Sequence, residues 1–250
     1  MNASRTSDPL APLLDLAGVR DAAGGARAAL DEVYRHPANR HGWPATAAEA
    51  SMRAARASAA LDGADVRLPG RGGAVPDPLL AGAVRIADAV GTLLATWQRA
   101  PLQALARLHV LAAADLTADD DALGRPRAGG PVSERLHLLA SLVTGTSGVP
   151  GVVLAAVVHG ELLALAPFGV ADGVVARAAA RLTAISTGLD AKGLAVPEVG
   201  HLRHAAEYRR AAGGFATGEP DAVAAWIVHC CQAWQAGAGE ARSIADAAAP

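Results

Sequence analysis

Residues 162–181 read LLALAPFGVADGVVARAAAR, and the expected fold is organised around this stretch. The apolar run that ends at Ala166 predicts one helix, which Pro167 and Gly169 interrupt. A second apolar helix is expected to start after Asp172 and Gly173. A loop that leads into a helix N-terminus presents backbone N–H groups without intrahelical partners, and such groups bind anions. We therefore place the candidate functional site in this loop.

The composition favours an all-α fold. Hydrophobic residues make up 52% of the 250 residues but aromatic residues only 3%, because the excess is alanine. Alanine is the strongest helix former, and its small side chain lets helices pack closely. The formal net charge is −2 and the basic residues form no run, so we expect no nucleic-acid or membrane-surface partner.

Cysteine usage and hydropathy favour a cytoplasmic location. Cys230 and Cys231 are adjacent in an apolar helical pattern, so their side chains point apart and we expect free thiols. No basic segment followed by an apolar one suggests a secretion signal at the N-terminus. The most apolar run, residues 152–166, contains His159 and Glu161 and is shorter than the roughly 20 residues of a membrane span.

Residues 166–177 resemble the signature of the Fic (Fido) family, which reads His-Pro-Phe-x-Asp/Glu-Gly-Asn-Gly-Arg-x-x-Arg. The positions that match are Pro167, Phe168, Gly173 and Arg177. The resemblance implies a Fic-like helical bundle. Members of that family transfer the adenylyl or phosphoryl part of a nucleotide to a protein hydroxyl.

The residues that carry the family's chemistry are replaced. Ala166 stands at the position of the catalytic histidine and Val170 at that of the metal-binding acid. Asp172 replaces the asparagine, and Val174 replaces the first arginine. Asp172 precedes Gly173 at the expected helix start, where Asp is a preferred N-cap, so we expect its carboxylate to fill the anion-binding loop in place of a phosphate.

A second resemblance lies upstream, on a helix expected to open at Thr46 and to end near residue 61. Ser58, Asp62 and Gly63 match the family's autoinhibitory motif, Ser/Thr-x-x-x-Asp/Glu-Gly. In the family the acid of this motif pairs with the last arginine of the signature. The resemblance therefore implies that Asp62 lies within about 8 Å of Arg177, the reach of a direct or water-bridged ion pair.

Two shorter matches follow in family order. Leu108 and His109 resemble a Leu-His pair on a core helix, and His109 alone reads as a hydrogen-bonded core histidine. Gly124 and Arg127 resemble the Gly-x-x-Arg that precedes the family's flap, a β-hairpin that holds the target peptide. Only four residues, 128–131, separate Arg127 from the next expected helix, so the flap is predicted to be reduced or absent.

These matches predict three parts of the chain. Residues 1–75 form an N-terminal helical arm with the inhibitory-type helix, residues 76–190 form the Fic-like core, and residues 191–250 form C-terminal helices packed on the core. In the segment 35–44, which is dense in Pro, Gly and His, Trp43 is expected to anchor a surface connection in the core.

Other candidate residues lie outside the signature. His159 is seven residues before Ala166, or about 10 Å along a helix, so it is expected to be structural rather than a substitute base. Glu198, His201 and His204 resemble a metal cluster on paper, but they lack a further ligand at diagnostic spacing. No metal site is predicted.

Two function classes remain. The first is a non-catalytic Fic-like protein that binds no cofactor and acts as an interaction or regulatory module, with a protein or a second copy as partner. The alternative is a divergent nucleotidyl or phosphoryl transferase that uses ATP with magnesium and holds phosphate with Arg177, Arg125 or Arg127. It requires an open cleft beside Gly173 with arginines converging there.

Overall fold

The fold, taken from a computed structural model, is described for residues 8–67 and 73–249. Every regular element in these residues is a helix, which confirms the all-α class. The α-helices are α1 (Val19–Arg35), α2 (Pro37–His41), α3 (Trp43–Leu61), α4 (Pro78–Arg99), α5 (Pro101–Ala113), α6 (Gly130–Thr144), α7 (Gly151–Leu165), α8 (Asp172–Ser186), α9 (Pro197–Arg203), α10 (Ala205–Phe215) and α11 (Pro220–Ala247), and the 3-10 turns are η1 (Ala11–Asp15) and η2 (Asp120–Ala122).

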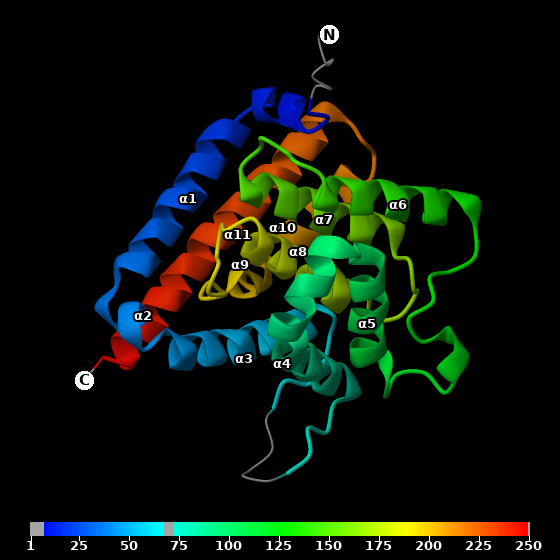
Figure 1. Ribbon diagram of the computed structural model, residues 1–250, viewed down its shortest axis with the longest axis horizontal. Coiled ribbons are helices and arrows are strands. Elements are labelled where there is room, and N and C mark those ends of the chain that lie inside the picture. The colour runs from blue at the N-terminus through cyan, green and yellow to red at the C-terminus, as the bar shows by residue number, and fades with distance from the viewer. Residues whose placement is uncertain (1–7, 68–72, 250) are drawn as a thin grey trace.

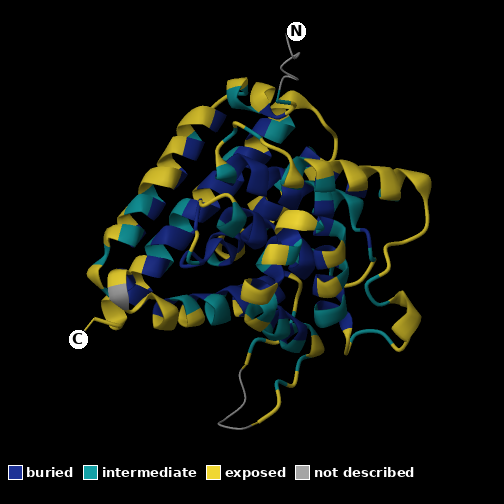
Figure 2. Cartoon of the chain, in the orientation of Figure 1, coloured by how far each residue is buried: buried dark blue, intermediate teal, exposed yellow. Residues whose placement is uncertain are grey.

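The helical hairpin of α7 and α8 forms the centre of the molecule (Figure 1). Residues 152–160 of α7 and 174–184 of α8 are all buried, because both helices are apolar around most of their circumference and other helices cover them (Figure 2). The loop between them is held between two rigid elements.

Helices α1 and α11 lie side by side along one edge of the bundle (Figure 1). Leu30 and Val33 of α1 share a buried cluster with Trp226 and Ile227 of α11. The indole Nε1 of Trp226 donates a hydrogen bond of 2.8 Å to the carbonyl of Ala156 in α7. The first and last helices of the chain are thereby fixed to the central hairpin.

Helices α4 and α5 pack closely because Gly82 lacks a side chain. A Cβ atom at Gly82 would overlap the backbone of Ala112. Among the described helices, α4 has the length and apolar composition that would suffice to cross a membrane. In this fold its Leu80, Ile86 and Trp97 are buried in the cluster that also contains the apolar residues of α8.

The expected anchoring role of Trp43 is wrong. Trp43 begins α3 and is 38% exposed, and its ring lies 5.8 Å from the ammonium nitrogen of Lys192. The core contact of this segment comes from the buried Asn39, whose side-chain amide donates to the carbonyl of Val33 at 2.9 Å and whose Oδ1 accepts from the Thr46 hydroxyl at 2.8 Å. A short helix, α2, therefore replaces the expected irregular connection.

Candidate functional site

The loop between α7 and α8 turns through three residues with left-handed backbone. Ala166 has φ 40°, Gly169 has φ 80° and Ala171 has φ 55°. The left-handed region disfavours residues with a Cβ atom, so the conformations of Ala166 and Ala171 must be held by their surroundings. The rest of the site supplies those contacts.

The carboxylate of Asp172 holds the loop from inside. It accepts hydrogen bonds from the backbone N–H of Phe168 at 2.9 Å and of Gly169 at 2.7 Å. The expected N-cap role is wrong, because Ala171 is the N-cap residue and Asp172 is the first residue of α8, from which it reaches back into the loop. Its carboxylate still occupies loop amides that would otherwise be free to bind an anion.

Burial raises the pKa of Asp172 above its ordinary value, and the amides of Phe168 and Gly169 act in the opposite direction. The charge of Arg127 also acts to lower this pKa, and the Asp62 carboxylate acts to raise it to a smaller extent. Two acidic side chains therefore lie near the start of α8.

Arg177 is the centre of a buried polar network. Its side chain is 2% exposed, and it donates to Ser58 Oγ at 2.7 Å, to the Ser58 carbonyl at 2.9 Å, to Asp62 Oδ2 at 2.7 Å and to the Tyr208 hydroxyl at 3.0 Å. The expected proximity of Asp62 and Arg177 is confirmed. Burial alone would lower the pKa of Arg177, but Tyr208 and Asp62 outweigh it, so the guanidinium stays charged.

The end of α3 aims Asp62 at this arginine. Gly63 has φ 91°, Ala64 N–H donates to the Ala59 carbonyl, and Gly63 N–H donates to the Ala60 carbonyl, each at 3.1 Å. These two bonds define a Schellman C-cap, in which glycine supplies the left-handed residue that other side chains disfavour.

Gly173 provides the space that Asp62 occupies. A Cβ atom at Gly173 would overlap the Asp62 carboxylate. The end of α3 therefore covers the first turn of α8 at close range, and the Asp62 carboxylate lies between solvent and Arg177.

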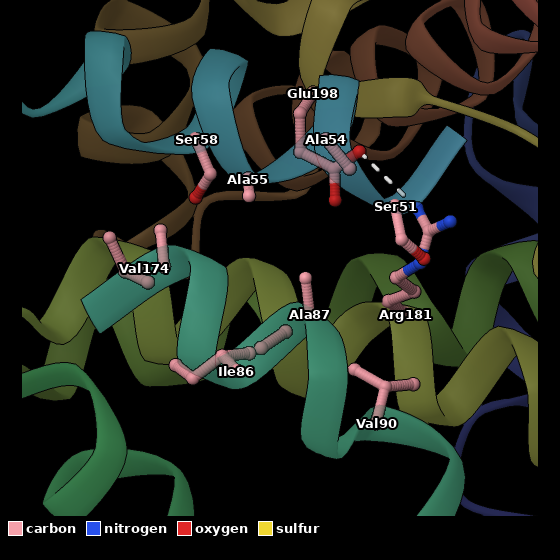
Figure 3. Close-up of a pocket in the computed structure, with 12 residues that line it drawn as sticks. Ser51, Ala54, Ala55, Ser58, Ile86, Ala87, Val90, Val174, Arg181 and Glu198 are labelled. Atoms are coloured by element: carbon pink, nitrogen blue, oxygen red, sulfur yellow. Dashed lines mark ion pairs between the residues drawn. The ribbon is translucent and has the colours of Figure 1, made fainter. Parts of the chain in front are cut away.

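Val174 marks the loss of the first signature arginine. Its side chain is buried and lines a small cavity of about 30 Å³ between α3, α4 and α8, together with Ser58, Ile86 and Val90 (Figure 3). This position faces the contact between these three helices.

His109 supports the loop from α5. Its ring stacks on Phe168 with centroids 4.1 Å apart and planes 5° from parallel, and its Nδ1 accepts from the Gly124 N–H at 2.9 Å. The expectation of a hydrogen-bonded core histidine is confirmed. Burial lowers the pKa of His109, and the backbone of Val170 acts in the opposite direction. The Nε2 atom of His109 is buried and makes no hydrogen bond to any described residue.

The segment before α6 lies directly on the loop. Arg127 donates its N–H to the Pro167 carbonyl at 2.7 Å and its Nη2 to the Leu165 carbonyl at 3.0 Å. Arg125 is exposed and lies 3.6 Å from Asp121. No flap strand forms in the described residues, and a cavity of about 380 Å³ adjoins the loop, lined by Leu102, Leu105, Pro126, Arg127, Ala128, Gly129, Ser133, Leu136, His137 and Phe168.

The structure separates one residue of the metal cluster suggested on paper from the other two. His204 is exposed beside Glu207, whereas Glu198 is buried with its Oε2 3.6 Å from Arg181. His201 lines the same small cavity as Glu198 and lies among His159, His229, Tyr208 and Trp226. His159 is a core histidine as expected, with its Nε2 2.9 Å from the Tyr208 hydroxyl.

No short motif indicates this aromatic group, because its members come from four helices and share no short spacing. Tyr208 was missed for the same reason, although it connects His159 with Arg177. Taken one at a time, α7, α9, α10 and α11 each show only a polar aromatic side chain, and nothing in a single helix indicates that these side chains meet.

The fold and site define a class of protein. It is an all-α bundle built on a helical hairpin, and the loop of that hairpin leads into a helix N-terminus. An aspartate at the end of another helix pairs with the buried arginine next to this loop. Solved structures share the fold. A Fic family protein from Desulfovibrio desulfuricans superposes with a TM-score of 0.69 and 19% identity, covering 89% of this chain and 74% of that one. Fic-1 from C. elegans superposes with a TM-score of 0.71 and 16% identity, covering 95% of this chain and 76% of that one.

The chain therefore has the fold of Fic family proteins. The similarity extends beyond residues 52–188, where the sequence motifs lie, and includes the outer helices. No protein-family model matches the sequence, and no curated protein matches it.

Proposed function

We propose that this protein is a non-catalytic Fic-like module that acts through interaction or regulation. The observation that carries the proposal is the Asp172 carboxylate, which accepts from the Phe168 and Gly169 amides inside the loop. A phosphate would have to displace this internal anion and overcome repulsion from Asp62 nearby. The Asp172 carboxylate thus takes the place that a nucleotide phosphate would need.

The chemistry that the resemblance implies has no residues to carry it. Ala166 cannot accept a proton, and general base catalysis alone is typically worth about 10²- to 10⁴-fold in rate. The side chain of Val170 has no oxygen to bind magnesium, and the carboxylate of Asp172 in the same loop is engaged with backbone amides. The residues present therefore do not fit ATP with magnesium, and we propose no cofactor.

The alternative of a divergent transferase needs arginines with free donors beside Gly173. Arg177 has its donors directed to Ser58, Asp62 and Tyr208, and Asp62 covers Gly173. Arg127 is directed to loop carbonyls. These contacts favour the non-catalytic reading, in which ATP and magnesium are not ligands.

The partner that we propose is a protein or a second copy of this chain. The net charge of −2 and the absence of a basic run speak against nucleic acid and an anionic membrane surface. Light scattering of the purified chain over a range of concentrations tests self-association. A concentration-dependent dimer identifies the second copy as the partner, and a monomer at all concentrations leaves a different protein in that role.

Calorimetric titration with ATP, with and without magnesium, tests the loss of nucleotide binding. Wild type and Asp62→Ala are titrated in parallel, with Asp88→Ala as a matched control because Asp88 is exposed on α4 and remote from the loop. We expect no binding by any of the three at millimolar ATP.

Either of two results overturns the proposal. Binding by wild type with magnesium shows that the loop still accepts a phosphate. Binding by Asp62→Ala but not by Asp88→Ala shows that the inhibitory-type helix guards a working site, which is the result the transferase alternative requires. Both variants are checked by circular dichroism at the titration temperature.

A further inference from the structure

A group of metal-ligand side chains lies behind the candidate site. His159 of α7, His201 of α9 and Cys230 of α11 each offer one ligand atom, and these atoms all lie within 4.8 Å of one another. All three residues are buried. Three helices that are distant in sequence thus bring two imidazoles and a thiol to one point.

The two histidines are held as metal ligands commonly are. His159 uses Nε2 to contact the Tyr208 hydroxyl at 2.9 Å, and His201 uses Nδ1 to contact His229 Nε2 at 3.1 Å. Within the described part of the chain, these hydrogen bonds leave the second ring nitrogen of each histidine for another partner. A metal-bound histidine typically fixes its orientation through just such a bond from its other nitrogen.

The space between the ligands suits a single ion. His159, His201 and Cys230 line one small cavity of about 10 Å³, too small for an organic ligand. Tetrahedral zinc, with bonds of about 2.0–2.3 Å, places its ligand atoms about 3.5 Å apart, so the observed group has to contract by about 1 Å. Side-chain rotation about Cys230 and the imidazoles supplies a movement of that size without shifting the helices.

The charged groups that line the cavity balance one another once the thiol is ionised. Arg177 and Arg181 line the cavity and oppose a cation, but Glu198 lines it too. The Oε2 atom of Glu198 is buried without a hydrogen-bond partner, with only Arg181 Nη1 at 3.6 Å. The Cys230 thiolate and the Glu198 carboxylate offset the charges of the two arginines, and Asp62 also pairs with Arg177.

We infer that His159, His201 and Cys230 form a buried site for one zinc ion per chain. The donor set of two imidazoles and one thiolate is of the kind that zinc prefers over magnesium or calcium. On binding, the Cys230 sulfur exchanges its proton for the metal, and the proton leaves to solvent.

This site lies next to the arginine of the candidate site. The Tyr208 hydroxyl contacts His159 Nε2 on one side and accepts from Arg177 Nη1 on the other, at 3.0 Å. A metal on His159 therefore fixes the tyrosine that holds Arg177. Zinc binding would therefore restrict the motion of Arg177 and of the Asp62 side chain that pairs with it.

Cobalt spectroscopy tests the site directly. The chain is unfolded in guanidinium with a chelator and a phosphine reductant, freed of the chelator while still in denaturant, and refolded by dilution with one equivalent of Co²⁺, because a buried site is loaded during folding. We expect one cobalt per chain, a thiolate-to-cobalt charge-transfer band with tetrahedral visible bands, loss of these bands on adding Zn²⁺, and a thermal midpoint raised by several degrees with Zn²⁺.

Cys231 supplies the matched control, since it is the adjacent buried cysteine but not a member of the ligand group. Cys231→Ser is expected to keep the charge-transfer band, and Cys230→Ser to lose it together with at least about 10-fold in zinc affinity. His204→Ala, which removes an exposed histidine, is expected to bind as wild type does.

Two outcomes overturn the inference. One is a wild-type chain that refolds with Co²⁺ but shows no thiolate band. The other is a band that disappears in Cys231→Ser, which would assign it to the wrong thiol. Since wild type and Cys231→Ser decide the question between them, the inference stays testable even if Cys230→Ser does not fold.

Discussion

The Asp62 carboxylate lies 2.7 Å from the Arg177 guanidinium, joining the end of α3 to the first half of α8 across 115 residues of sequence. The arginine side chain is 2% exposed and the aspartate side chain 27% exposed. A guanidinium at that depth needs a counter-charge, and Asp62 supplies it from the solvent side. The same carboxylate covers Gly173, so one side chain both neutralises the arginine and closes the approach to the loop.

Replacing Asp62 by alanine is expected to destabilise the fold. The change leaves the buried Arg177 with neutral partners only, and we expect a loss of about 2 kcal/mol, below the 3–5 kcal/mol typical of a fully buried pair because Asp62 is partly exposed. Chemical denaturation of wild type and variant measures the difference. Asp88→Ala on the exposed face of α4 should change the free energy of unfolding by less than about 0.5 kcal/mol. Equal effects of the two substitutions would contradict the role assigned to Asp62.

Gly173→Ala tests whether Asp62 fills the space in front of α8. The added methyl group would overlap the Asp62 carboxylate, so we expect the substitution to displace Asp62 and to destabilise by about 1–3 kcal/mol in wild type. In an Asp62→Ala background the overlap is gone, and the same change should be close to neutral. A double-mutant cycle by urea denaturation gives a coupling of at least about 1 kcal/mol. Additive effects would show that the two residues do not meet.

The alanines with left-handed backbone are expected to gain from glycine. Ala166 and Ala171 have positive φ, which a side chain disfavours, so Ala166→Gly and Ala171→Gly should each stabilise the protein by about 0.5–1 kcal/mol after the loss of chain entropy is subtracted. Ala48→Gly, at an exposed interior position of α3, should instead destabilise by about 1 kcal/mol. Thermal unfolding distinguishes the signs, and a loss of stability at both loop positions would mean that the loop is not left-handed there.

The pH dependence of stability should include a contribution from His109. Burial holds its pKa below the ordinary value of 6.5, so the unfolded chain binds a proton that the folded chain does not. Stability is therefore fully present above pH 6.5 and falls as the pH drops through the window between 6.5 and the folded-state pKa. The contribution is at most about 1.4 kcal/mol per pH unit within that window.

The variant His109→Phe isolates this contribution. A phenyl ring keeps the stack on Phe168 but has no proton to gain, and it leaves the Gly124 N–H without its acceptor. We expect the variant to be less stable than wild type at neutral pH by about 1–2 kcal/mol, with a difference that shrinks on acidification. The measurement is the free energy of unfolding as a function of pH for both proteins. A difference that grows with acid would show that folding raises the pKa of His109.

The all-α class and the Asp62–Arg177 contact could be predicted from the sequence. Helical periodicity in an alanine-rich chain is a local property, and the order of short motifs placed Asp62, His109 and Arg177 in one framework. Asp62, His109 and Arg177 each belong to a short motif, and the motif indicates where in the fold the residue lies. The Gly-x-x-Arg match at Gly124 and Arg127 did not predict that Arg127 would contact the carbonyls of the loop.

The rest depends on distances that the sequence does not contain. Asp172 was expected to cap its own helix, but the left-handed Ala171 took the N-cap position and turned the carboxylate toward the Phe168 and Gly169 amides. Trp43 was expected in the core because large aromatic residues usually lie there, whereas the small Asn39 made the buried contacts. The meeting of His159 with His201 and Cys230 follows from the packing of three helices and has no local pattern.

The network around Arg177 also bears on how the chain folds. Its partners Ser58, Asp62 and Tyr208 lie on α3, at the end of α3 and on α10, so the guanidinium is fully paired only when segments from both ends of the chain have docked on α8. A partly assembled bundle would hold a desolvated charge with too few partners and would be strongly disfavoured. Folding intermediates in which α3 or α10 has not docked on α8 are therefore unstable. We expect these two helices to join the bundle in a single cooperative step.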